Sequence, residues 1–222
     1  TSDQSVASLL TAMLQMSRDS VGCVPSHLET DQGGISFCVD EFETGTICAL
    51  FHDLSVPEDL GHILASEMLH LFIEDNRTVL VNTGRPSMSS TYVFPDRRIA
   101  QTVRNSMTTL LDNLQDEPGI RICGLSNQDS CDPFFTRIAV DQHAFDANIT
   151  GVIESAAFLL GKLCDGLDNI SMSMGVSTAH CTKVDEEQWF VVVADNVLSN
   201  ISSVRQTADV LKKAFSIATS LD

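Results

Sequence analysis

Apolar and polar positions recur along this chain with the periods of helices and strands. Over residues 5–16, apolar side chains three and four positions apart form one stripe, which predicts an amphipathic helix. Residues 35–39 alternate apolar side chains with Ser36 and Cys38, and a second apolar segment follows over 46–51. The first expected elements are therefore a helix and a β-hairpin of two half-buried strands.

A well-marked helix start follows the hairpin. The sequence Ser55-Val-Pro-Glu58 is a capping box with proline in the first turn, and the apolar positions behind it predict a helix that ends near Asp75. Two weak strands are expected next, over 78–81 and 89–94. A further helix is expected after the second of them.

A turn signal at Asp116-Glu-Pro-Gly119 ends that further helix and divides the chain. After it the same order of elements starts again. The expected elements are strands at 120–125 and 134–140, a helix over 146–164, strands at 170–177 and 189–194, and a helix that starts at Ser199 or Asn200. The segment 189–194 is continuously apolar, as in a central strand covered on both faces.

The recurring order predicts an α+β fold of two tandem units, at 1–117 and 118–222. Each unit reads strand–strand–helix–strand–strand–helix, with an antiparallel sheet packed against helices, and one extra helix lies at the N-terminal end. The two halves share a pattern and negligible sequence identity. A single α+β domain whose alternation happens to recur is the alternative.

Composition excludes several classes of protein. Of 222 residues, 30 are acidic and 13 basic, so the formal net charge is −17, and 43% of residues are hydrophobic. This apolar content supports a packed core and argues against disorder. The few basic residues are scattered, which argues against nucleic-acid binding. Apolar runs fall far short of the ~20 residues of a membrane-spanning helix. We therefore expect an acidic globular protein with no nucleic-acid partner and no transmembrane segment.

The cysteines indicate a reducing compartment. There are seven, an odd number, and none forms a C-x-x-C motif. Most lie in apolar segments, where a free cysteine behaves as a small hydrophobic residue. We expect all seven to be free and the protein to be cytoplasmic.

No motif for catalysis or nucleotide binding is present. The sequence lacks a P-loop, a G-x-G-x-x-G fingerprint and a G-x-S-x-G nucleophile elbow. His180 and Cys181 are adjacent, but neighbouring side chains on an extended segment point to opposite faces. No catalytic or cofactor-binding residue is therefore assigned.

One helix carries the strongest hint of a metal site. Glu58 and His62 are four residues apart, and Glu67 and His70 three apart, so each pair can share a helix face. A metal site needs three or four convergent ligands. We therefore expect no metal site.

Two acidic clusters fall in predicted hairpin turns, at Asp40–Glu43 and Asp185–Glu187. Neither has the spacing of a calcium-binding loop. They are expected to be solvated turns, and the functional alternative is an acidic surface that attracts a basic partner.

The second half resembles the longin and roadblock families of profilin-like domains over residues 146–218. The residues that carry the resemblance are the helix 146–164, the alternating strand 170–177, the turn 185–187, the strand 189–194 and the helix after Asp195-Asn196. In the first half, the helix at 5–16 takes the place of the leading roadblock helix. The resemblance implies a non-enzymatic platform whose domains pair with each other and bind small GTPases or trafficking machinery.

We therefore expect a protein–protein interaction platform that is not an enzyme. It would be an adaptor or subunit of a small-GTPase-regulating or membrane-trafficking assembly, with a small GTPase or a longin/roadblock-type subunit as partner. Two alternatives stay open. One is an α+β enzyme with dispersed site residues, and the other is a small-ligand sensor in which the Met-rich strand 170–176 lines a pocket.

Overall fold

The computed structural model describes residues 2–40, 45–83, 96–127, 131–160 and 167–221. The chain divides into two compact units, Thr1–Tyr92 and Val93–Asp222. Both combine helices with an antiparallel sheet, so the fold class is α+β, as expected. No helix in the described ranges is both long enough and apolar enough to cross a membrane.

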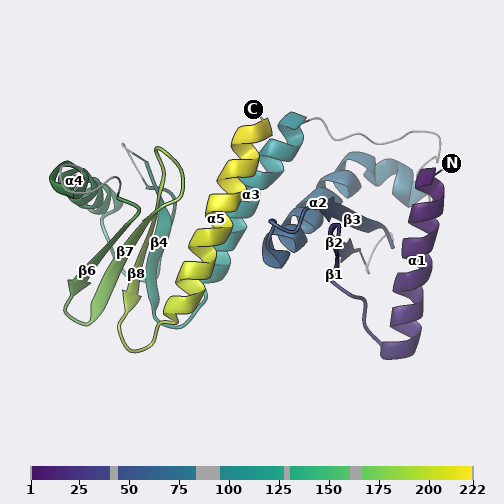
Figure 1. Ribbon diagram of the computed structural model, residues 1–222, viewed down its shortest axis with the longest axis horizontal. Coiled ribbons are helices and arrows are strands. Elements are labelled where there is room, and N and C mark those ends of the chain that lie inside the picture. Colours follow the sequence, from purple (N-terminus) through teal and green to yellow (C-terminus); the bar gives the residue numbers. More distant parts are fainter. Residues whose placement is uncertain (1, 41–44, 84–95, 128–130, 161–166, 222) are drawn as a thin grey trace. The chain divides into compact units, whose positions relative to one another are not determined.

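The described residues of the first unit form a three-stranded sheet and two helices (Figure 1). The elements are α1 (Ser2–Val21), β1 (His27–Thr30), β2 (Gly33–Val39), β3 (Ile47–His52) and α2 (Glu58–Thr83). The strands are antiparallel in the order β1-β2-β3, and α2 packs against β2 and β3. Phe37 and Leu60 are fully buried in this layer. The helix α2 begins at the predicted capping box.

The expected strand at 78–81 is wrong, because these residues belong to α2. No glycine or proline interrupts residues 62–83, so the helix continues past Asp75. Leu80 is buried in this extension. The other expected strand, 89–94, lies outside the described residues. The described part of the first unit therefore shows three strands, of which β1 was not predicted.

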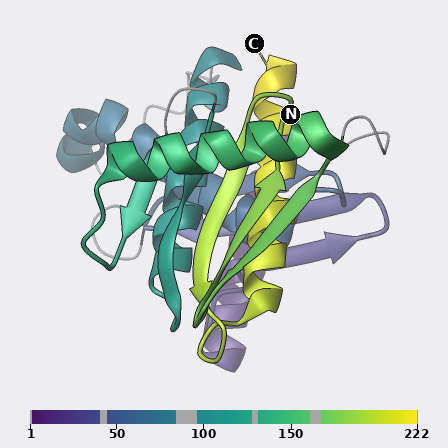
Figure 2. The same cartoon turned by 90° about the vertical axis from the view of Figure 1, so that its left-hand side faces the viewer.

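The second unit is a three-layer arrangement around a five-stranded sheet. Its elements are α3 (Asp96–Gln115), β4 (Ile120–Ser126), β5 (Cys131–Thr136), α4 (Gln142–Leu160), β6 (Asn169–Met174), β7 (Ser177–Lys183), β8 (Trp189–Asp195) and α5 (Ile201–Leu221). All neighbouring strands are antiparallel, in the order β5-β4-β8-β7-β6. Helices α3 and α5 pack together on one face, and Figure 2 shows α4 across the other face.

Burial on both faces of β8 confirms the expectation of a central strand. Val191 packs with Ile149 and Ile153 of α4. Because successive strand side chains alternate, Phe190 and Val192 face α3 and α5, and both are fully buried. The long apolar run of this strand is thus explained by helices on both sides.

Helix α3 belongs to the second unit. It packs against α5, β4 and β5, and Val103 and Met107 are buried. The expected boundary after residue 117 instead made this helix the end of the first unit. The division into compact units falls before α3, because its apolar stripe is covered by elements that follow it in the sequence.

The chain forms two strands where one was expected over 170–177. Gly175, with φ of 66°, lies in the turn between β6 and β7. Strand β7 pairs with both β6 and β8, although the segment Ser177–Lys183 is mostly polar. The sequence did not predict this strand, because one face of β7 is not covered by an apolar layer and its residues there are polar. Strand β5 spans 131–136, where 134–140 was expected.

A candidate docking surface

The residue pairs considered for metal binding do not converge. His62 Nδ1 lies 3.1 Å from the carbonyl oxygen of Phe37, so this ring bridges α2 to β2. Within the described ranges, no three side chains of His, Cys, Asp or Glu are placed to hold a metal ion. The role of His62 is therefore structural.

His180 and Cys181 lie on opposite faces of β7. His180 Nδ1 and Ser171 Oγ share a hydrogen bond of 3.1 Å on the α5 side. Cys181 is fully buried beneath α4, and burial raises the pKa of its thiol to about 12. The two side chains therefore cannot form a cysteine–histidine catalytic pair.

Two histidines and a serine form a hydrogen-bonded chain in the first unit that the sequence did not reveal. Ser36 Oγ lies 3.1 Å from His27 Nδ1 and 3.0 Å from His52 Nε2. His52 Nδ1 lies 3.1 Å from the carbonyl oxygen of Asp53, which only accepts, so this nitrogen carries the proton. In the neutral ring, Nε2 then accepts from Ser36, and His27 Nδ1 donates to Ser36.

The centre of this network is buried, which gives the network a structural role. Ser36 is fully buried, and the two imidazole rings are stacked with centroids 5.5 Å apart. A Cβ at Gly61 of α2 would contact Ser36 Oγ and would lie 2.9 Å from His52 Nε2. The absence of a side chain at Gly61 lets α2 approach the network. The sequence could not predict this network, because its three polar residues come from three different strands.

The acidic turn Asp185–Glu187 lines a cavity in the second unit. Of the other acidic turn, Asp40–Glu43, residues 41–43 lie outside the described ranges. The cavity has a volume of about 980 Å³ and lies among α3, α5, β4, β5 and the β7–β8 turn. We call it the acid-rimmed groove. The carboxylates and the apolar residues that define it are Asp132, Asp185, Glu186, Glu187, Met107, Leu125, Phe215 and Ala218.

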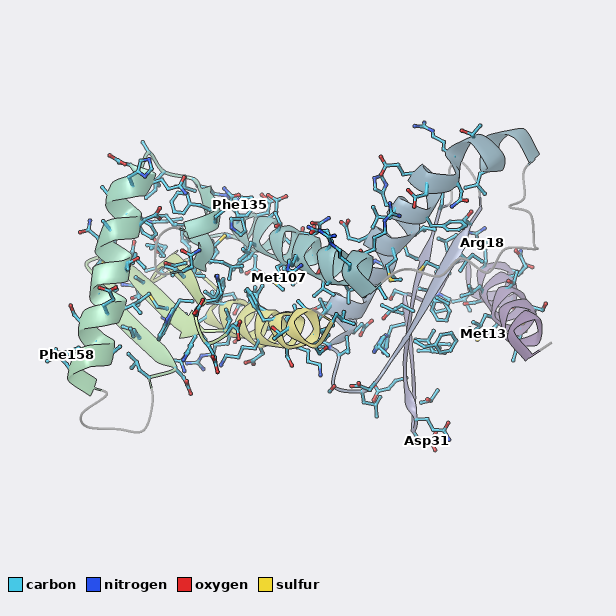
Figure 3. The ribbon with its side chains drawn as sticks, turned by 90° about the horizontal axis from the view of Figure 1, so that it is seen from above. Met13, Arg18, Asp31, Met107, Phe135 and Phe158 are labelled. Atoms are coloured by element: carbon cyan, nitrogen blue, oxygen red, sulfur yellow. The ribbon has the colours of Figure 1, made fainter. Side chains whose placement is uncertain are left out.

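The acid-rimmed groove combines charge with an apolar base. Four carboxylates line it and one arginine, Arg104, stands among them. Met107, labelled in Figure 3, lines the groove and is buried, so it forms part of its apolar base. Such a surface is complementary to a segment that carries basic and apolar side chains, because the carboxylates attract the approaching cations and the base buries apolar area.

The edges of the five-stranded sheet offer a second kind of docking surface. Among the described strands, β5 and β6 are the outer ones, so within the described part of the chain each presents main-chain groups on one side that no strand pairs with. Met174 at the end of β6 and Val176 in the turn after it are exposed. Phe158, labelled in Figure 3, and Leu159 are exposed near the end of α4. Exposed apolar side chains next to an open sheet edge are typical of surfaces that bind other proteins.

The order of elements in the second unit is the order that the resemblance implied. A hairpin is followed by a helix, then by antiparallel strands that complete the sheet, and then by a closing helix. The second unit has a longin/roadblock-like fold. Helix α3 is the leading helix of the second unit. The sequence analysis had named a leading helix, at 5–16, for the first unit alone.

Solved structures of low sequence identity resemble this chain. MglB of Myxococcus xanthus is 15% identical with a TM-score of 0.46, over 50% of this chain and 95% of that one. The gliding protein MglB of Thermus thermophilus is 13% identical with a TM-score of 0.44, over 61% and 99%. A Roadblock/LC7 domain of Streptomyces avermitilis is 14% identical with a TM-score of 0.38, over 49% and 93%. No protein-family model and no curated protein matches the chain in sequence.

Proposed function

We propose that this protein is a non-enzymatic protein–protein interaction platform that works as an adaptor or subunit of a small-GTPase-regulating or membrane-trafficking assembly. The observation that carries the docking part of the proposal is the acid-rimmed groove. The choice of assembly is supported by the resemblance of residues 146–218 to longin and roadblock domains, in which paired sheets and exposed helices form the working surface.

The charge of the chain supports a basic partner. A formal net charge of −17 repels further copies of the chain and attracts a cationic surface over a distance that about 0.15 M salt limits to about 8 Å. The groove places four of the carboxylates around an apolar base, where a bound cation is partly shielded from salt. The partner is therefore a different protein, with a basic and apolar docking segment.

Affinity capture from a lysate of the source organism, at low and at physiological salt, tests the proposal. The bait is compared with the triple variant Asp185→Asn, Glu186→Gln, Glu187→Gln. The matched control removes three exposed carboxylates of the first unit, Glu29→Gln, Asp31→Asn and Glu74→Gln, and has the same net charge.

We expect a small GTPase or a longin/roadblock-type subunit to bind the wild type and the control, and the groove variant to recover about tenfold less of it. Equal recovery by both variants would show that the groove is not the docking site. Recovery of no such protein by the wild type, or turnover of a substrate by the purified chain, would contradict the platform itself.

A further inference from the structure

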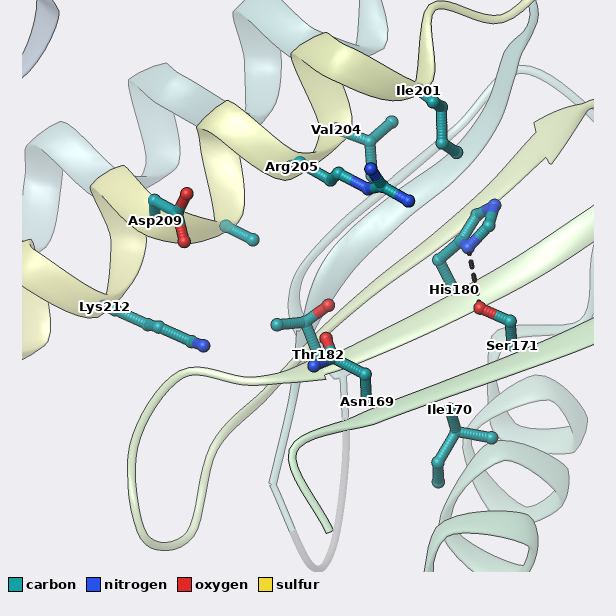
Figure 4. Close-up of a pocket in the computed structure, with 11 residues that line it drawn as sticks. Asn169, Ile170, Ser171, His180, Thr182, Ile201, Val204, Arg205, Asp209 and Lys212 are labelled. Carbon is teal, nitrogen blue, oxygen red and sulfur yellow. Dashed lines mark hydrogen bonds between the residues drawn. The ribbon is translucent and has the colours of Figure 1, made fainter.

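A second cavity of the second unit has the opposite charge. It has a volume of about 480 Å³ and lies between α5 and the β6–β7 hairpin (Figure 4). We call it the cationic groove. Its polar lining comes from both sides, with Asn169, Ser171, His180 and Thr182 on the hairpin and Arg205 and Lys212 on the helix.

The register of the hairpin and the period of the helix create this groove. Ser171 and His180 are directly opposite each other in the β6–β7 pair, so they share one face of the sheet. Met172 and Cys181, their neighbours, face α4 instead. On α5, Arg205 and Lys212 are seven residues apart, which is two helical turns, so both extend on the side that faces the hairpin.

Among the described residues, the two cations of the groove have no counter-charge bound to them. Neither Arg205 nor Lys212 has an ion-pair or hydrogen-bond partner within the described part of the chain. Among the described residues, Asp209 is the one carboxylate that lines the groove, and it has no ion-pair or hydrogen-bond partner among them either. In a chain with 30 acidic and 13 basic residues, this lining of two cations and one carboxylate is net positive.

The imidazole of His180 adds a polar group to the groove and carries no negative charge that would repel an anion. Partial burial and then the nearby Arg205 guanidinium lower the pKa of His180, so the ring is neutral at physiological pH. Its Nδ1 shares the hydrogen bond with Ser171 Oγ that is drawn in Figure 4. The hydroxyl groups of Ser171 and Thr182 and the amide of Asn169 complete a set of hydrogen-bond donors.

We propose that the cationic groove binds the phosphate group of a small soluble phosphomonoester. Arg205 and Lys212 supply charge-assisted hydrogen bonds to the phosphate oxygens, and the hydroxyl groups of Ser171 and Thr182 donate to them. Ile201, Val204 and Ala208 form an apolar wall beside these cations, and this wall contacts the organic part of the ligand. The volume of the groove is within the range of about 300–1,000 Å³ of small-molecule sites.

A soluble ligand fits the charge of the protein better than a lipid headgroup. The net charge of −17 repels a membrane surface that carries many anionic lipids far more strongly than it repels one small phosphomonoester. The Asp209 carboxylate lies between Arg205 and Lys212 in the sequence of α5 and weakens the attraction for a dianion. Its replacement by asparagine should therefore strengthen phosphate binding.

Phenyl phosphate is a suitable probe, because it joins one phosphate to an apolar ring. The full chain, labelled for NMR, is titrated with phenyl phosphate, and parallel titrations use phenol and sodium chloride at matched ionic strength. We expect saturable shifts at Ser171, His180 and Arg205 with phenyl phosphate alone. The pKa of His180, followed by its ring protons, should rise in the bound state because a nearby anion favours the imidazolium.

Four variants identify the binding residues. Arg205→Gln and Lys212→Gln should each weaken phenyl phosphate binding about tenfold or more, while Lys213→Gln, which removes the same charge at the next position and does not line the groove, should change it less than about twofold. Asp209→Asn should strengthen binding, a gain that a misfolded variant cannot produce.

Several outcomes would overturn the proposal. These are shifts that phenol or chloride reproduces, equal losses in Arg205→Gln and Lys213→Gln, and no gain in Asp209→Asn. Vesicles that contain phosphatidic acid provide the last test. Binding to these vesicles, with none to phenyl phosphate, would assign the groove to a lipid headgroup and would contradict a soluble ligand.

Discussion

Arg121 at the start of β4 and Asp195 at the end of β8 form an ion pair of 2.9 Å across the central strands of the five-stranded sheet. The Asp195 carboxylate also accepts hydrogen bonds from the main-chain N–H of Val197 at 2.9 Å and of Leu198 at 3.3 Å. One side chain thus ties the β4–β8 pair to the turn that leads into α5. These hydrogen bonds, first that from Val197 and then that from Arg121, lower the pKa of Asp195.

Replacing Asp195 with alanine should lower the melting temperature of the second unit by several degrees, because the turn before α5 loses its acceptor. The matched control is Asp116→Ala. Asp116 pairs with Arg137 at the same 2.9 Å, but its side chain is 87% exposed. Exposed ion pairs contribute little, so this control should melt close to the wild type. Equal losses in thermal denaturation would show that the hydrogen bonds of Asp195 add nothing to an ion pair.

The stabilisation from Asp195 should depend on pH. Its pKa is lower in the folded state than in the unfolded state, so the unfolded chain binds the proton more tightly. The contribution is therefore complete above the ordinary pKa of about 3.9 and is lost as pH falls through the lower folded-state value. The difference between wild type and Asp195→Ala should be constant near neutral pH and shrink in acid. Urea unfolding at a series of pH values measures it, and a difference that grows in acid would contradict the argument.

Gly61→Ala should destabilise the first unit by about 1–3 kcal/mol. The new methyl group would collide with Ser36 and His52, and α2 would have to move away from the sheet. Gly151→Ala in α4 is the control, since nothing lies within 4 Å of the added Cβ, and it should stabilise the protein by about 0.5–1 kcal/mol. Amide hydrogen exchange of each unit measures both effects. A neutral Gly61→Ala would mean that α2 and the network are not in close contact.

Ser36→Ala should also destabilise the first unit, by about 1–3 kcal/mol. It leaves His27 Nδ1 and His52 Nε2 without the shared hydroxyl in a part-buried site. Ser220→Ala, which removes an exposed hydroxyl that donates to a carbonyl of its own helix, should cost less than about 0.5 kcal/mol. Denaturant unfolding compares the two, and similar small values would exclude a stabilising role for the network.

All seven cysteines should be free, and their reactivity should follow burial. Cys23, Cys38, Cys48, Cys123 and Cys181 are free, and only Cys23 among these five is exposed. Burial raises the pKa of Cys123 and of Cys181 to about 12 each, so these thiols are protonated and enclosed near neutral pH.

Mass spectrometry of the alkylated protein tests this order. Native alkylation should modify Cys23 first and leave Cys123 and Cys181 unmodified. Alkylation after denaturation without reductant should modify all seven cysteines of the sequence. Two or more cysteines that react only after a reductant is added would show a disulfide and contradict a reducing compartment.

The sequence by itself determined the elements in which buried positions recur with a regular period or a capping motif marks the start. The apolar stripes of α3 and α5, the alternation of β2, the capping box before α2 and the apolar run of β8 all predicted the observed structure. In the helices and strands, a packed layer covers positions at a regular spacing, so the apolar residues of that segment recur with the same spacing. The capping box is likewise a local pattern.

Only the tertiary structure decided the features that depend on pairing between distant residues. Strand β7 forms although its segment is mostly polar, because β6 and β8 supply its hydrogen bonds. The cationic groove depends on the same pairing. Arg205 and His180 are far apart in the sequence, and they come together because one face of the β6–β7 hairpin lies beside α5, a relationship that no local pattern encodes.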